Sequence, residues 1–116
     1  MMEELINALE KMGCDMKSTL LRFLGDEEFY AECLTDMLAD EGFARLGTEL
    51  EAEDAKAAFA TAHMLKGIIS NMGIRSMLDI IVQIVEPLRG GNAAGLMPLY
   101  EELMSEKAKY DALVAN

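Results

Sequence analysis

His63 is the one histidine in this chain of 116 residues, and its side chain has the clearest chemical potential. Neutral imidazole can act as a base, a nucleophile or a metal ligand near pH 7. General acid–base catalysis would need an orienting carboxylate or a nucleophile beside the ring, and none lies within a helical turn on the same face. A metal site would need at least two further ligands. Direct attack by a ring nitrogen needs neither, so the residues favour transfer of a group onto the imidazole.

The residues that share a helical face with His63 are small or basic. The positions three residues before it, four after it and seven after it are one face of an α-helix, and they hold Ala60, Gly67 and Ser70. Lys66 lies at the flank of this face, and Lys56 lies two turns back on the face itself. A phosphoryl group on the imidazole would bring about two negative charges, which Lys66 can partly offset. The pattern is therefore compatible with a phosphoryl group on the ring.

Gly67 needs an explanation of its own. A glycine inside a helix costs about 1 kcal/mol relative to alanine, and its main structural benefit is the close approach of another surface. We therefore expect a large partner to reach the His63 ring from this side. Phe59 lies on the flank between His63 and the expected core, and its ring is interpreted as the edge of the core rather than as binding surface.

The elements that must position these residues are helices. Apolar residues recur at intervals of three and four, and no stretch alternates as a strand would. The pattern predicts short N-terminal helices within about 2–24, followed by four longer helices at about 26–51, 54–72, 74–89 and 94–114. We expect the first of these four to be one helix, irregular around Gly42. The predicted fold is an all-α, antiparallel four-helix bundle with short additional N-terminal helices, and a single domain over residues 1–116.

The helix at 54–72 contains His63 and should end at Gly73, which accepts a left-handed conformation. Its core-facing stripe is predicted to be Ala55, Ala58, Ala62, Leu65, Ile69 and Met72. Pro87 should kink or end the next helix, the stretch 89–95 should be a loop, and Pro98 should lie in the first turn of the last helix.

Charge and cysteine content exclude several classes of function. The chain has 10 Lys and Arg against 21 Asp and Glu, for a formal net charge of −11. No basic run is present, so nucleic acid and anionic membrane surfaces are not expected partners. The chain has no long uncharged apolar stretch, and its beginning is acidic rather than like a secretory signal. Cys14 and Cys33 form no CxxC motif, so we expect no zinc site and two reduced, buried thiols in a cytoplasmic protein.

The stretch AHMLKGIISNMGI, residues 62–74, resembles the signature of histidine-containing phosphotransfer (HPt) domains. The signature places a leucine two residues after the histidine, Lys-Gly next, a small residue, an asparagine and a glycine. Here these positions are His63, Leu65, Lys66, Gly67, Ser70, Asn71 and Gly73. The upstream stretch LLRFLGDEEFYAECLTDML, residues 20–38, is similar to the start of that family's bundle. Ile68 and Ile69 depart from the small residues common there, but Ile69 faces the core and Ile68 points away from His63.

The resemblance implies a four-helix bundle whose exposed histidine exchanges phosphoryl groups with receiver-domain aspartates. His63 would be the phosphoacceptor, Lys66 would stabilise the phosphoryl charge, and Gly67 would allow the partner to approach. Lys56, Ala60 and Ser70 would belong to the docking surface, whereas Asn71 and Gly73 would shape the helix end. The implied partners are response-regulator receiver domains and a hybrid sensor kinase.

The chain would then be a phosphocarrier rather than an enzyme. It would have no intrinsic cofactor or metal, because magnesium would lie on the receiver, and a monomer would suffice. No nucleotide-binding glycine pattern is present, so autophosphorylation from ATP is not expected.

Two alternatives remain open on the sequence. The first is an HPt-like helical adapter that binds a signalling partner without phosphotransfer. The second is an unrelated acidic helical interaction protein that uses its ten methionines as a pliable surface. An exposed, methionine-rich groove with a buried His63 would favour the second alternative.

Overall fold

The computed structural model describes residues 2–115, and within this range it consists of helices and connecting turns without a strand. The helices are α1 (Met2–Lys11), α2 (Met16–Leu21), α3 (Glu27–Leu38), α4 (Gly42–Glu51), α5 (Ala55–Met72), α6 (Arg75–Arg89) and α7 (Met97–Val114). The all-α prediction is confirmed. None of the helices in residues 2–115 combines the length and apolar content needed to cross a membrane.

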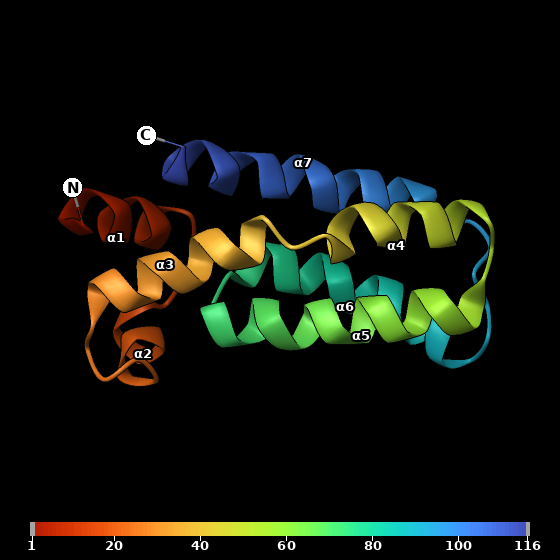
Figure 1. The fold of residues 1–116 in the computed structure, drawn as a ribbon, viewed down its shortest axis with the longest axis horizontal. Helices are drawn as coiled ribbons and strands as arrows, with labels where there is room; N and C mark the ends of the chain where they lie inside the picture. Colours follow the sequence, from red (N-terminus) through yellow and green to blue (C-terminus); the bar gives the residue numbers. More distant parts are fainter. Residues whose placement is uncertain (1, 116) are drawn as a thin grey trace.

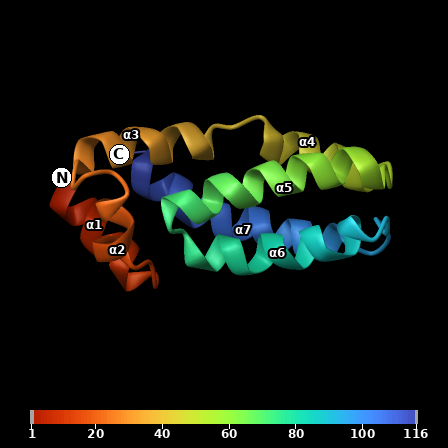
Figure 2. The same cartoon turned by 90° about the horizontal axis from the view of Figure 1, so that it is seen from below.

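The bundle consists of four antiparallel helical segments, which we call its legs. Figure 1 shows α3 and α4 following one another along the first leg, with α5, α6 and α7 as the other three. Each leg runs antiparallel to the one before it, and α1 and α2 pack at the end where α5 finishes and α6 begins (Figures 1 and 2). The predicted architecture, an antiparallel four-helix bundle with short additional N-terminal helices, is therefore found.

The first leg is not the single helix expected over 26–51. It is interrupted between Leu38 and Gly42, because the Asp40 carboxylate accepts a hydrogen bond from the Gly42 backbone N–H at 2.7 Å, a local bond that competes with the helical pattern. The interruption also brings Gly42 against α5, where an added Cβ would lie 2.9 Å from Met64 Cε and 3.2 Å from Leu65 Cδ2. The irregularity that the sequence suggested at Gly42 is thus a complete break.

The ends of the other bundle helices follow the predicted signals, except that α7 begins at Met97, three residues later than the start expected at about 94. Gly73 ends α5 in the left-handed conformation, with φ 74° and ψ 20°. Pro98 lies in the first turn of α7, where a missing N–H costs nothing. Pro87 lies inside α6, which ends two residues later at Arg89. The loop expected over 89–95 begins one residue later than predicted.

The core-facing stripe of α5 is largely as predicted. Ala55 is half-buried, and the other five residues of the stripe are buried: Ala58, Ala62, Leu65, Ile69 and Met72. The prediction of two buried thiols holds only for Cys14, because Cys33 lies at the edge of α3 and is half-buried. Both cysteines are free thiols.

Candidate functional site on the second leg of the bundle

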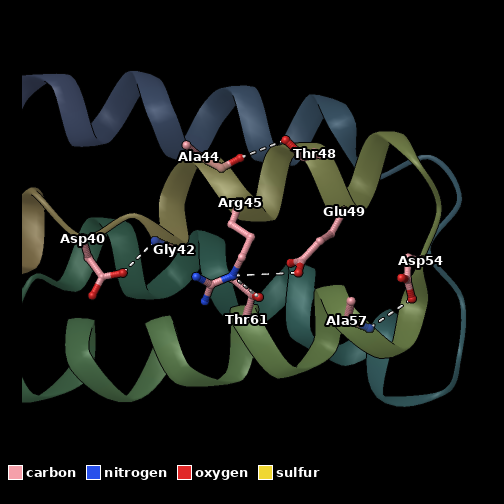
Figure 3. Close-up of polar contacts among 9 residues, drawn as sticks. All are labelled: Asp40, Gly42, Ala44, Arg45, Thr48, Glu49, Asp54, Ala57 and Thr61. Atoms are coloured by element: carbon pink, nitrogen blue, oxygen red, sulfur yellow. Dashed lines mark hydrogen bonds and ion pairs between the residues drawn. The ribbon is translucent and has the colours of Figure 1, made fainter.

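The α5 helix positions His63 near its middle, about two turns from either end. The helix begins after Asp54, whose carboxylate accepts a hydrogen bond from the Ala57 backbone N–H at 3.2 Å (Figure 3). It ends at Gly73, whose N–H bonds to the Ser70 carbonyl at 3.1 Å. His63 therefore lies on a well-defined stretch of helix, and its orientation is fixed by the burial of the opposite stripe.

The face around His63 is open. His63, Ala60, Gly67 and Ser70 are all exposed, as the helical spacing predicted. An added Cβ at Gly67 would meet no atom within 4 Å. By contrast, a Cβ at Gly47 would lie 2.6 Å from the Tyr100 hydroxyl, so that glycine is required by packing within the bundle. No part of the described chain makes use of the space at Gly67.

Side chains from the N-terminal segments hold the end of α5. The Arg22 guanidinium donates hydrogen bonds to the Asn71 carbonyl at 3.0 Å and to the Ser70 carbonyl at 3.3 Å. The Tyr30 hydroxyl, which is buried, donates to the Met72 carbonyl at 2.7 Å. These bonds add partners to carbonyls of the last turn, which lack the usual donor four residues further along the helix; the Ser70 carbonyl also accepts from the Gly73 N–H. Arg22 at the end of α2 and Tyr30 of α3 therefore fix the end of the helix that contains His63.

The α4 helix supports α5 from the side. Arg45 points from α4 toward α5, where its Nε donates to Thr61 Oγ1 at 3.3 Å and lies 3.9 Å from Glu49 Oε2 (Figure 3). Thr61 is buried although it was not part of the predicted stripe. A polar residue is tolerated at this buried position because the Thr61 hydroxyl accepts the hydrogen bond from Arg45.

The two lysines predicted for the site differ in exposure. Lys56 is exposed and Lys66 is half-buried, which fits a long side chain following the apolar border of the helix. Neither lysine forms an ion pair with any residue between 2 and 115. Their charges are therefore free to act on a ligand or partner at the His63 face.

Phe59 and Arg89 are closer to the site than sequence reasoning indicated. The Phe59 and His63 ring centroids are 5.5 Å apart with their planes tilted by 30°, and the Arg89 guanidinium carbon is 5.4 Å from the Phe59 centroid. Arg89 was missed as a site residue. The signal was present in the predicted hairpin, because two antiparallel helices joined near Gly73 place positions 59 and 89 at the same level.

The imidazole has no hydrogen-bonding partner among the described residues, so no carboxylate orients it as a general base. Within residues 2–115, no three His, Cys, Asp or Glu side chains gather where they could hold a metal ion. The arrangement is an accessible nucleophile with free cations close by. Attack on an electrophile supplied by another molecule is the chemistry that this geometry allows.

The chain matches no family model, no curated protein and no solved structure. The resemblance to HPt domains thus depends on the residues named above.

Proposed function

We propose that this protein is a histidine phosphocarrier, in which His63 accepts a phosphoryl group from a receiver-domain aspartate and passes it to another receiver. The principal supporting observation is the open space at Gly67, one turn from an exposed His63. A helix retains such a glycine at a cost in stability, and nothing inside the described chain benefits from it. Access for an outside surface accounts for it.

The proposed step is a displacement at phosphorus. The ring nitrogen without a hydrogen attacks the phosphorus of an aspartyl phosphate, so that an N–P bond forms while the P–O bond to the aspartate breaks. The electron pair of the broken bond leaves on the aspartate carboxylate, and the other imidazole nitrogen keeps its proton. Transfer to a second receiver is the reverse of this step.

In this proposal the residues near His63 have distinct tasks. Lys66 offsets part of the phosphoryl charge, Gly67 lets the receiver approach, and Lys56 attracts its acidic pocket. Ala60 and Ser70 form the rest of the docking surface. The magnesium ion and most of the catalytic groups belong to the receiver, so the chain is a carrier rather than an enzyme. It acts as a monomer in the cytoplasm.

The second candidate is an adapter that binds a signalling partner without accepting phosphate. The free charges of Lys56 and Lys66 fit either function, but binding alone does not need a nucleophile beside Gly67. The two candidates differ in one measurable property, which is covalent phosphate on the protein.

Incubation with a panel of phosphorylated receivers tests the proposal. We expect the wild type to acquire acid-labile phosphate and the His63→Gln variant to acquire none, since no other histidine is present. Ser105→Ala, an exposed change on α7, is the matched control and should behave as the wild type. Equal labelling of His63→Gln would disprove the assignment. Binding of a receiver by both proteins without labelling would establish the adapter instead.

A further inference from the structure

Phe59 and His63 form an aromatic contact on the flank of α5 that faces α6. Their ring centroids are 5.5 Å apart, and the 30° tilt is within the range of favourable aromatic pairs. Phe59 is half-buried while His63 is exposed, so the phenyl ring is the better fixed of the two. A ring held in this way limits the rotation of the imidazole beside it.

Arg89, the last residue of α6, stacks on the same phenyl ring. Its guanidinium carbon lies 5.4 Å from the Phe59 centroid, within cation–π distance. Its Nε lies 3.4 Å from Glu86 Oε2, but both side chains are more than half exposed, so this ion pair is weak. The two Nη atoms have no hydrogen-bonding partner within residues 2–115. Most of the N–H donors of the Arg89 guanidinium are therefore available to bind an anion.

We propose that Phe59 is a positioning residue for the His63 imidazole and that it holds the Arg89 guanidinium ready for the phosphoryl group. This inference rests on the proposed phosphocarrier function. Both distances are measured to one ring, so the guanidinium lies within about 11 Å of the imidazole centre, their sum. A phosphoryl group projecting from His63 and a rotation of the arginine side chain close this gap.

The exchange of partners by Arg89 has a physical basis. A phosphoryl group with about two negative charges attracts a guanidinium more strongly than one carboxylate does. It also offers oxygens that a planar guanidinium can bind in pairs, which a lysine cannot do. On phosphorylation, Arg89 leaves Glu86 and binds the phosphoryl oxygens, while Phe59 keeps the imidazole turned toward it.

The arrangement also defines the side from which a receiver approaches. Phe59, Arg89 and Lys66 occupy the α6 flank of His63, whereas Ala60 and Gly67 leave the other flank open. The phosphoryl group is thus bounded by cations on one side and accessible from the other.

The ring contact is tested without any phosphodonor. Because His63 is the one histidine, its ring-proton NMR signals need no assignment. Phe59→Leu, which keeps apolar volume but removes the ring, should move these signals toward their positions in the urea-unfolded protein. Phe59→Tyr, which keeps the ring, should retain the wild-type positions. Unchanged signals in Phe59→Leu, or a loss of them in Phe59→Tyr, would overturn the positioning role, provided circular dichroism shows the wild-type fold.

The role of Arg89 is tested on protein phosphorylated chemically with phosphoramidate, from which the imidazole displaces ammonia. The Arg89 Nε–H signal, identified by its absence in Arg89→Lys, should shift on phosphorylation of the wild type and of Phe59→Tyr. It should remain in place in Phe59→Leu. A wild-type signal that does not respond to phosphorylation would refute the exchange of partners.

Phosphoryl exchange with a receiver then measures how strongly Arg89 stabilises phosphorylated His63. In exchange with a phosphorylated receiver, Arg89→Gln should lower the equilibrium ratio of phosphorylated to free His63 by about 1.4- to fivefold, the range for an exposed ion pair. Arg89→Lys should recover part of the loss. Equal ratios in all three proteins would contradict the inference. If phosphorylated wild type passes phosphate to no receiver, the phosphocarrier function fails, while the two NMR measurements still judge Phe59 and Arg89.

Discussion

Gly67 and Gly73 both lie in the second half of the α5 region, and the chain uses them for different reasons. Gly73 adopts φ 74°, a left-handed conformation, and its missing Cβ makes room for Thr19. Gly67 has ordinary helical geometry and open space around it. Substitution separates the two cases, because only at Gly67 can alanine be accommodated without strain.

Gly67→Ala should stabilise the fold and weaken phosphotransfer. Alanine gains about 1 kcal/mol in a helix relative to glycine, and the added methyl group meets nothing within 4 Å in the free protein. Urea unfolding should show a higher free energy of unfolding, while transfer from a phosphorylated receiver becomes slower. A larger change, Gly67→Gln, should slow transfer further.

Ser105→Ala on α7 is again the matched control. It also replaces an exposed helical residue by alanine, so it should raise stability slightly and leave transfer unaffected. A Gly67→Ala variant with increased stability and undiminished transfer would show that Gly67 is not there to admit a partner.

At the scale of the elements, the position of His63 depends on how the end of α5 is held. Two side chains hold it, because Arg22 at the end of α2 and Tyr30 of α3 donate hydrogen bonds to carbonyls of the last turn. The Tyr30 phenol is fully buried, and desolvation raises its pKa well above the usual range. Its hydrogen bond to Met72 is thus made in surroundings from which water is excluded.

Tyr30→Phe should lower the free energy of unfolding by about 1–3 kcal/mol, because the buried Met72 carbonyl loses its donor. Urea unfolding followed by circular dichroism measures the change. Tyr100→Phe is the comparison, since the Tyr100 hydroxyl donates to the Phe43 carbonyl at 2.8 Å in a half-buried position that water can reach. It should cost less. Equal stability of Tyr30→Phe and the wild type would show that the bond does not hold the helix end.

For the molecule as a whole, a polar cluster joins α6, α7 and the α1–α2 turn at the end of the bundle. The Ser76 and Tyr110 hydroxyls are 2.7 Å apart, and burial raises the pKa of Tyr110 to about 12. Burial likewise raises the pKa of Cys14. Hydrogen bonds from Lys109 and Ser76 lower the pKa of Glu106. Among these groups, Glu106 makes stability depend on pH in the acidic range.

The lowered pKa of Glu106 determines whether stability rises or falls with pH. The charged carboxylate stabilises the folded state above its ordinary pKa of 4.5, and this contribution is lost as the pH falls through the lower folded-state value. Glu106→Gln should therefore be less stable than the wild type by about 0.2–1 kcal/mol at pH 7. The difference should shrink in urea unfolding at pH 3.

Glu102→Gln, an exposed change on the same helix, is the control and should show no such convergence. An unfolding difference for Glu106→Gln that is the same at both pH values would contradict the role assigned to its charge.

The sequence by itself determined the helical class, the limits of α5 and the exposure of His63. These follow from local physics: apolar spacing selects a helical face, Asp54 and Gly73 suit the two ends, and the face opposite the buried stripe must be exposed. The break between α3 and α4 was indicated by Gly42 but not resolved, because it depends on an Asp40 bond and on packing against Met64 and Leu65.

Tertiary structure alone decided which side chains from other helices reach the site. The contact of Arg89 with Phe59 requires the α5–α6 pairing, and the bond from Arg45 to Thr61 requires that α4 lie beside α5. It also decided that the space at Gly67 stays empty. Such facts concern residues distant along the chain, and their positions are set only when the helices pack into one core.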